Sequence, residues 1–272
     1  MRSTCTIAWA LALISLLLSP APLGAQQGAK PFEPEVGQPG KDVVWVPTPP
    51  ALVEKMMDMA QVGPNDFVID LGSGDGRNVI AAAKRGAQAL GVEFNPDMVG
   101  LSERMAKSAG VSDRAKFVQG DMFTADISKA TVMAIFLLPS NMLQLRAKFF
   151  NLAPGSRIVS NTFRIEGWNP DKSETIGGDC TAWCESILWI VPAKVGGRWT
   201  GSNSDLTLTQ DYQMVSGTLT VGGKPVPVSG QLNGREITLK AGDRTYTGRA
   251  GDSEIELSSA GAAAVRLARA AN

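Results

Sequence analysis

"VIDLGSGDGRNVIAAAKRGAQALGVEFNP", residues 68–96, joins an apolar run, a glycine-rich turn and an alanine-rich segment. The apolar run is typical of a short buried strand, and the segment after the turn has the composition and length of a helix. A second apolar run follows and ends at Glu93, 23 residues beyond Asp70. Glycines in such a turn let the backbone bend sharply and approach a ligand closely. The stretch therefore predicts a nucleotide-cofactor turn inside a βα unit.

The alternation of strands and helices continues outward from this stretch. A first helix is expected after Thr48, its N-cap, with Gly63 and Pro64 as its stop. Further helices are expected over residues 75–85, 96–109 and 142–150. Apolar runs predict strands at 66–71, 88–94, 115–121, 131–138, 155–161 and 186–195. Repeated βα units of this length imply an α/β fold with a Rossmann-like, doubly wound, mainly parallel sheet.

The pattern of the chain changes near residue 196. Residues 48–196 carry the βα units, preceded by an extended Pro- and Gly-rich lead-in over 26–47, and residues 165–181 are expected to form an irregular insertion. Residues 197–272 contain short alternating runs separated by glycine-containing turns at intervals of about ten residues. This pattern predicts a small antiparallel all-β unit, a sandwich or a barrel, with residues 262–271 as a last strand or a helix.

The N-terminus has the pattern of a signal peptide over residues 1–25. Arg2 provides a positive charge, Ile7 to Leu18 is an uncharged apolar run, and small residues precede Gln26. The run is too short to span a bilayer comfortably, so cleavage near Ala25 is favoured over an uncleaved membrane anchor. The mature protein is therefore expected in the periplasm or outside the cell, with no integral membrane span.

Composition excludes several kinds of site. The chain has no histidine, which removes Ser-His and Cys-His triads and the commonest zinc ligand. Its formal net charge of zero does not favour nucleic acid as a partner. Cleavage would leave only Cys180 and Cys184, too few for a metal site, and no metal is expected. They could form a disulfide only if the chain bends, because four residues of strand span about 13 Å and a bridge allows about 7 Å.

The acidic residues around the turn narrow the choice of ligand. A dinucleotide turn has the pattern G-x-G-x-x-G, but its third glycine is replaced here by Arg77, and no G-K-[ST] is present. Asp70 would repel a pyrophosphate and suits a cationic or zwitterionic ligand. Glu93 is placed to accept from both ribose hydroxyls, and Asp121, at the end of the third strand, from an adenine amino group. An adenosine without phosphates that carries a positive amino-acid tail is S-adenosylmethionine.

Five motifs carry a family resemblance over about residues 43–195. "VIDLGSGDGR", "GVEFNP" and "VQGDMF" resemble the cofactor motifs of class I S-adenosylmethionine-dependent methyltransferases. "WVPTP" at 45–49 and "FLLPS" at 136–140 resemble segments of the small protein-lysine methyltransferases exemplified by the mitochondrial adenine-nucleotide-carrier lysine methyltransferase. Those relatives are intracellular, whereas this chain begins with a predicted export signal and adds a β-rich unit.

The resemblance implies a role for each matching position. The turn would hold the methionine end of the cofactor, Thr48 would touch the same end, Glu93 would hold the ribose, and Asp121 would lie beside the adenine. The implied cofactor-binding residues are Thr48, Asp70, Leu71, Gly72, Ser73, Gly74, Asp75, Glu93, Phe94, Asn95, Asp121 and Met122. Leu138, Pro139 and Ser140 would form the lip where the acceptor meets the methyl group, and Trp45 is a further candidate for lining this channel. Trp168, Trp183 and Trp189 are expected to be packing residues.

The resemblance implies N-methylation of a protein lysine by direct in-line transfer. Methyl transfer from a sulfonium needs orientation of donor and acceptor rather than a general base, so no catalytic residue is assigned. Two alternatives remain open at this point: methylation of a small molecule, and an exported binding module that keeps the fold without the activity.

Overall fold

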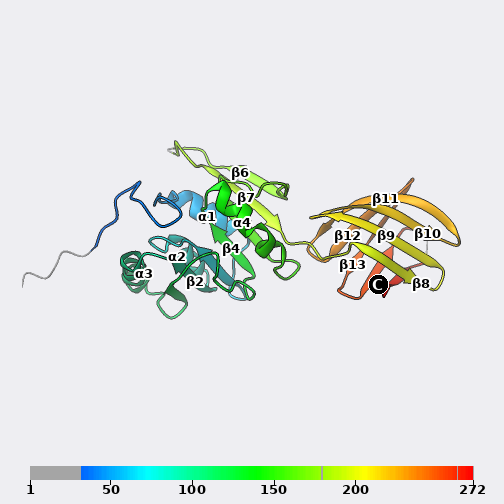
Figure 1. The fold of residues 1–272 in the computed structure, drawn as a ribbon, viewed down its shortest axis with the longest axis horizontal. Coiled ribbons are helices and arrows are strands. Elements are labelled where there is room, and N and C mark those ends of the chain that lie inside the picture. The colour runs from blue at the N-terminus through cyan, green and yellow to red at the C-terminus, as the bar shows by residue number, and fades with distance from the viewer. Residues whose placement is uncertain (1–31, 179, 262, 272) are drawn as a thin grey trace, which may run out of the picture. The chain divides into compact units, whose positions relative to one another are not determined.

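The computed structural model describes residues 32–178, 180–261 and 263–271, shown in Figure 1. Residues 32–272 form one compact unit. The signal peptide predicted over 1–25 and the start of the lead-in lie outside the described residues. Within the described part of the chain, no helix is long and apolar enough to cross a membrane.

A seven-stranded sheet has the order β3-β2-β1-β4-β5-β7-β6. Its first five strands along the chain pair in parallel, while β7 runs antiparallel to both β5 and β6. The mainly parallel sheet predicted from the apolar runs is thereby confirmed. The strands are β1 (Phe67–Leu71), β2 (Gln88–Glu93), β3 (Ala115–Gln119), β4 (Val132–Ile135), β5 (Arg157–Asn161), β6 (Lys172–Thr175) and β7 (Glu185–Ile190).

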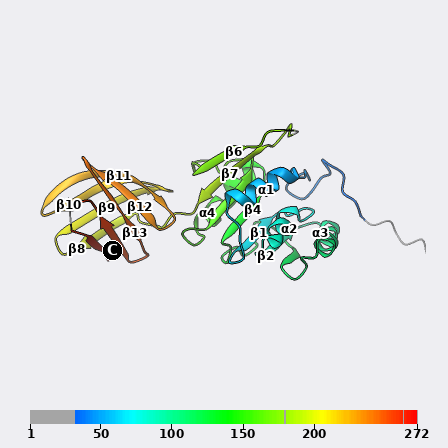
Figure 2. The same cartoon turned by 180° about the vertical axis from the view of Figure 1, so that it is seen from behind.

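Helices cover both faces of this sheet. They are α1 (Pro50–Met59), α2 (Arg77–Lys84), α3 (Pro96–Ser108) and α4 (Pro139–Phe150). Side chains alternate along β1, so Val68 packs in one core cluster with α1 and α2, and Ile69 in a second cluster with α4. Accordingly, α4 faces the viewer in Figure 1 and α1 faces the viewer in Figure 2.

The sequence predicted Thr48 as the N-cap of α1, and this prediction is wrong. Pro49 is the N-cap, and no side chain caps the helix. The Thr48 side chain is buried and its hydroxyl accepts a hydrogen bond from Asn161 of β5, 3.2 Å away. The hydroxyl is therefore used between segments far apart in the sequence rather than by the helix amides.

The insertion at 165–181 is not entirely irregular, because it contains β6. This strand and β7 form an antiparallel hairpin whose loop carries a disulfide between Cys180 and Cys184, with their Cα atoms 5.9 Å apart. The loop bends as the sequence required for such a bridge, and Trp183 within it has a left-handed backbone, φ +53°.

The C-terminal strands form a closed antiparallel barrel in the order β10-β11-β12-β13-β14-β15-β8-β9. Its apolar interior is a third core cluster that includes Trp199, Leu206 and Leu267. A barrel was one of the two predicted forms, and the last segment is a strand. The strands are β8 (Gly197–Gly201), β9 (Ser204–Asp211), β10 (Met214–Val221), β11 (Lys224–Asn233), β12 (Glu236–Ala241), β13 (Arg244–Ala250), β14 (Glu254–Ser258) and β15 (Val265–Arg269).

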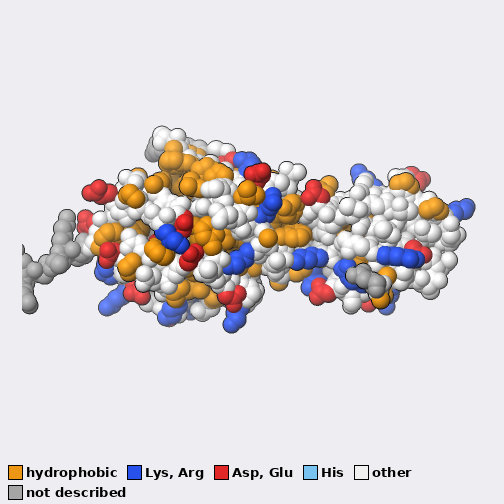
Figure 3. Space-filling view, in the orientation of Figure 1, with side chains coloured by type: hydrophobic (Ala, Val, Ile, Leu, Met, Phe, Trp, Pro, Cys, Tyr) orange, Lys and Arg blue, Asp and Glu red, His pale blue; other side chains and the backbone are white. Residues whose placement is uncertain are grey.

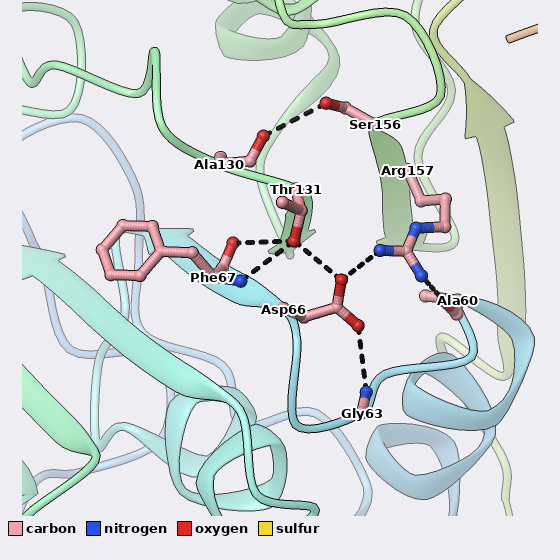
Figure 4. A network of polar contacts seen from close by, with 8 residues as sticks. All are labelled: Ala60, Gly63, Asp66, Phe67, Ala130, Thr131, Ser156 and Arg157. Carbon is pink, nitrogen blue, oxygen red and sulfur yellow. Dashed lines mark hydrogen bonds and ion pairs between the residues drawn. The ribbon is translucent and has the colours of Figure 1, made fainter.

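A polar network ties together the amino ends of β1, β4 and β5 (Figure 4). Asp66 accepts from Gly63 N at 2.9 Å, from the Thr131 hydroxyl at 2.8 Å, and from Arg157 in an ion pair. Burial alone would raise the pKa of Asp66, but these hydrogen bonds and the guanidinium outweigh it and hold the pKa below its usual value. The network lies at the amino ends of the parallel strands, whereas the glycine turn lies at their carboxyl ends.

Candidate active site

A pocket lies at the carboxyl ends of β1, β2 and β4, where parallel sheets commonly bind ligands. It encloses about 960 Å³, including solvent at its mouth. Its floor is the predicted glycine turn, and its walls come from the lead-in and from the segments that follow β4 and β5. The residues that line it at the strand ends and in the turns that follow them include Asp70, Gly72, Ser73, Gly74, Asp75, Glu93, Asn95, Phe136 and Leu138.

Backbone hydrogen bonds to β2 fix the position of the turn between β1 and α2. Gly72 N and Ser73 N donate to Val92 O at 2.8 and 3.1 Å. Gly74 has φ +55°, and a Cβ added there would lie 2.9 Å from Trp45 Nε1. Glycine is therefore required at this position both by the backbone conformation and by the side chain packed on it.

Asp70 is buried in the pocket wall with one oxygen unsatisfied. Its Oδ2 accepts from Asn78 Nδ2 at 3.1 Å, whereas Oδ1 has no partner among the described residues. Burial raises the pKa of Asp70 well above its usual value, the Asn78 hydrogen bond opposes that rise, and the nearby Glu93 and Asp75 carboxylates add to it. An ammonium group in the pocket would satisfy the free oxygen and favour the ionised form. The methionine end of S-adenosylmethionine carries such a group, so this wall fits the cofactor.

Glu93 is fixed beside the turn by backbone donors. Its Oε2 accepts from Gly74 N and its Oε1 from Asn95 N, each at 2.9 Å. Each carboxylate oxygen keeps a further lone pair for a ligand, since an ionised carboxylate has about four acceptor positions. This geometry suits the two ribose hydroxyls that the sequence assigned to Glu93.

A smaller hollow adjoins the pocket and holds the residues expected at the adenine. It is lined by Phe94, Asp121 and Met122, together with Glu93 and part of the lead-in. Asp121 accepts from Lys41, whose ammonium lies 4.9 Å from the Phe94 ring centroid. The Lys41 hydrogen bond is the main cause that lowers the pKa of Asp121. An adenine in this hollow would therefore share Asp121 with the lead-in.

The lead-in forms one wall of the pocket, of which the sequence had indicated only Trp45 and the adjoining Thr48. Arg77 of α2 donates to Thr48 O and pairs with Asp75, so it joins the lead-in to the turn. Trp45 lines the pocket, as the sequence suggested. The lead-in residues in the lining are Gln38, Pro39, Gly40, Val43, Val44, Trp45, Val46 and Pro47, and Thr48 directly follows them in the lining. Proline- and glycine-rich segments have no periodicity that would reveal a buried face.

Most predicted site residues line one of the two hollows, and three do not. Leu71 is fully buried in the second core cluster beneath the turn. Pro139 and Ser140 start α4 next to Leu138 and are exposed, outside both linings. Binding roles for these three residues remain predictions.

Sequence reasoning missed three aromatic residues of the pocket. Phe136, Phe163 and Trp183 all line it, although the sequence predicts a packing role for Trp183. Trp183 is 42% exposed, which a packing residue would not be. The one signal in the sequence was its place between two cysteines that can pair only through a bend.

Comparison with known proteins agrees with this geometry. The ANTKMT methyltransferase domain family matches residues 70–172. A protein-lysine N-methyltransferase of Saccharolobus islandicus (strain REY15A) is 44% identical over 131 residues, which make up 47% of this chain and 81% of the relative. The adenine nucleotide translocase lysine N-methyltransferase of Mus musculus is 36% identical over 120 residues, which make up 43% of this chain and 52% of the relative.

A solved structure adds the fold and the kind of ligand. The RNA methyltransferase from Salinibacter ruber, in complex with S-adenosyl-L-homocysteine, is 43% identical with a TM-score of 0.51, over 55% of this chain and 96% of that chain. The Saccharolobus islandicus relative is matched over four fifths of its length at 44% identity. The chain therefore belongs to the same family as this protein-lysine N-methyltransferase, among the S-adenosylmethionine-dependent methyltransferases.

Proposed function

We propose that this protein transfers a methyl group from S-adenosylmethionine to the side-chain amine of a lysine in another protein. The observation that carries the proposal is the rim of the pocket. Val44, Leu138 and Trp183 line the pocket and are 51%, 39% and 42% exposed. Exposed apolar residues around an open mouth suit a macromolecule that inserts one side chain, whereas a small-molecule site encloses its ligand.

The relatives support the same acceptor. Those of Saccharolobus islandicus and Mus musculus are both named as lysine N-methyltransferases. In Figure 3, hydrophobic side chains gather beside the tip of the β6–β7 hairpin, the hairpin whose loop supplies Trp183. A protein surface is the natural partner for such a patch.

The chain contributes binding and orientation to the reaction. S-adenosylmethionine supplies a methyl group already activated by its sulfonium. Asp70 and Glu93 would fix the methionine and ribose ends, so that the methyl group points toward the acceptor mouth. Of the acidic groups that line the pocket, Glu93 is held by the turn and Asp75 by Arg77. Asp70 accepts from Asn78, and its free oxygen is assigned to the ammonium group of the cofactor, so none of the three serves as a base at the mouth. The acceptor amine must therefore arrive neutral, which removal from water in the apolar mouth favours.

An RNA acceptor is the rival suggested by the Salinibacter ruber structure. RNA binding requires unpaired basic groups that can meet phosphates. Arg77 in the pocket is paired with Asp75, and Lys41 beside it is paired with Asp121. The chain as a whole has 26 basic and 26 acidic residues. These charges favour the protein acceptor.

We propose further that the protein works in the periplasm or outside the cell. The predicted signal peptide supports this, and so does the disulfide between Cys180 and Cys184, because disulfides persist in oxidising compartments. Fusion of the full chain to a reporter that is active only in the periplasm tests the proposal. Reporter activity that disappears when residues 1–25 are deleted is expected, and activity only in a cytoplasmic fusion would contradict it.

Radiolabelling identifies the acceptor class. The purified full chain is incubated with methyl-labelled S-adenosylmethionine and cell-envelope protein, with total RNA in a parallel sample. Label in protein, located on lysine by mass spectrometry, is expected. Label only in RNA or only in small molecules would overturn the protein acceptor, and a heat-inactivated sample is the control.

A further inference from the structure

Three aromatic side chains stand at the pocket mouth without a role in binding the cofactor. We infer that Phe136, Phe163 and Trp183 form the subsite for the acceptor amine, and that the Cys180–Cys184 disulfide holds Trp183 in it. This inference rests on the proposed function, since it specifies the acceptor end of the same pocket. The ligand class is a lysine amine together with its methylated, cationic forms.

The fold brings the three residues to one edge of the sheet. Phe136 directly follows β4 and Phe163 follows β5, at the carboxyl ends of two neighbouring parallel strands. Trp183 precedes β7, and because β7 is antiparallel to β5, its amino end lies at the same edge. All three line the pocket that contains the glycine turn, and none lines the adenine hollow. They therefore lie near the methionine end of the cofactor site, where the methyl group would be.

The rings contact one another in a fixed arrangement. Phe136 stacks on Phe163 with ring centroids 5.8 Å apart, and Trp183 meets Phe136 edge to face at 6.1 Å. This arrangement presents aromatic faces at two angles, as a site for a substituted ammonium requires.

Backbone strain accompanies the aromatic residues. Thr162, next to Phe163, and Trp183 itself are non-glycine residues with φ of +57° and +53°. Thr162 is β-branched, for which this conformation is a true outlier. Its amide is held by Glu185 O at 2.8 Å, while the Trp183 loop is closed by the disulfide. Strain of this kind persists where the surroundings enforce it, commonly at binding sites.

The reaction places positive charge where the rings lie. The lone pair of the neutral amine forms the new N–C bond as the C–S bond breaks, and the C–S electron pair returns to sulfur. Positive charge thus leaves sulfur and appears on nitrogen, from which a proton is then lost to water. Aromatic faces stabilise that developing cation without accepting a hydrogen bond, and they also bind the methylated product.

Binding of charged and neutral lysine analogues tests the subsite. The probes are Nα-acetyl-trimethyl-lysine amide and its neutral isostere with carbon in place of the nitrogen, titrated by NMR into the full chain saturated with S-adenosylhomocysteine. The unmodified protein should bind the charged probe about 5- to 30-fold more tightly, the range expected of a cation over aromatic faces. Equal affinities would overturn the inference.

Substitutions test which residues produce the preference for the charged probe. Trp183→Ala should remove most of that preference and Trp183→Phe should retain it, while cofactor affinity by calorimetry stays unchanged in both. Leu143→Ala is the matched control, because Leu143 is 39% exposed on α4 and lies outside the pocket lining. The double variant Cys180→Ser with Cys184→Ser should weaken binding of the charged probe about as much as Trp183→Ala does. Wild-type affinity for this probe in the double variant would overturn the role of the disulfide.

The two proposals fail differently. If envelope protein is not labelled on lysine, the proposed function fails whatever the probes show. If lysine is labelled but Trp183→Ala leaves both the acceptor KM and the probe preference unchanged, the function stands and the aromatic subsite is wrong.

Discussion

At the scale of single residues, Asp70 suits a bound ligand but lowers the stability of the ligand-free protein. Asp70 is 2% exposed and leaves one oxygen without a partner in the described part of the chain. A buried carboxylate with unmet hydrogen-bonding capacity lowers the free energy of unfolding unless a ligand compensates it. The same residue is thus a cost to the free protein and a contact in the complex.

Asp70→Asn should raise stability while it weakens cofactor binding. The neutral amide keeps an acceptor for Asn78 and removes the buried charge, so the free energy of unfolding at pH 8 should rise by about 1–3 kcal/mol. Calorimetry should show the cofactor Kd at least about 10-fold higher, the loss of one charge-assisted hydrogen bond.

The stability gain from Asp70→Asn should depend on pH. The pKa of Asp70 is raised in the folded state, so the folded protein holds this proton more tightly than the unfolded chain does. The gain from Asp70→Asn should therefore be largest above the folded pKa and shrink as the pH falls toward the unfolded value of 3.8. Thermal unfolding at pH 5 and pH 8 measures it. Asp75→Asn is the control, since Asp75 is paired with Arg77 and its loss should destabilise instead.

Gly74→Ala should reduce both stability and cofactor affinity. The left-handed conformation costs an alanine about 1–2 kcal/mol, and its Cβ would in addition press on Trp45. Gly110→Ala separates the two effects, because Gly110 has φ +70° and open space around a Cβ. We expect a similar conformational cost in both variants and a Kd change, of about 10-fold or more, only in Gly74→Ala. Equal cofactor affinity in the two variants would contradict the close packing of the turn.

At the level of secondary-structure elements, the buried strands could be predicted from the sequence, whereas the edge strand β6 could not. Buried parallel strands appear in the sequence as continuous apolar runs, and every such run became a strand. β6 was missed because its four residues, KSET, are polar and mostly exposed, so an edge strand has no apolar signal. Thr48 was placed at a helix cap by local pattern, whereas its partner, Asn161, is 113 residues away. The lead-in and Trp183 joined the site through tertiary packing, which no local window contains.

The network around Asp66 stabilises the sheet without touching the pocket. Asp66→Asn should lower the free energy of unfolding at pH 7 by about 2–3 kcal/mol, somewhat less than for a fully buried pair, because Arg157 would lose its partner. The pKa of Asp66 is depressed in the folded state, so this contribution is present above the unfolded value of 3.8 and is lost as the pH falls through the folded pKa.

Denaturant titrations at pH 7 and pH 3 measure this difference, which should be smaller at pH 3. Cofactor affinity should not change. Glu256→Gln provides a surface comparison, since its pair with Arg266 is half exposed and should contribute less than about 1 kcal/mol. A comparable loss in both variants would argue against a special role of the network.

In the whole molecule, the sheet and the barrel have separate hydrophobic cores. The two clusters that flank the sheet contain no residue of the barrel cluster among their buried members. The two clusters of the sheet pack on opposite faces of the same strands, whereas the barrel closes around its own core, so two cooperative unfolding steps are expected. Differential scanning calorimetry should show two transitions, and S-adenosylhomocysteine at about 100 times its Kd should stabilise only one of them, by about 2.7 kcal/mol. A single transition that shifts as a whole would show that the cores are coupled.

The closure of the barrel has a consequence for the order of assembly. β15 pairs with β8, with Ala268 opposite Thr200, so the ring closes across 68 residues of chain. The strand that completes the ring is thus synthesised after the whole cofactor domain and after the other seven barrel strands. Until it arrives, β8 and β14 expose open edges that can pair with other chains. Removal of β15 would make that transient hazard permanent, so quality control of this protein depends on the strand that closes the ring.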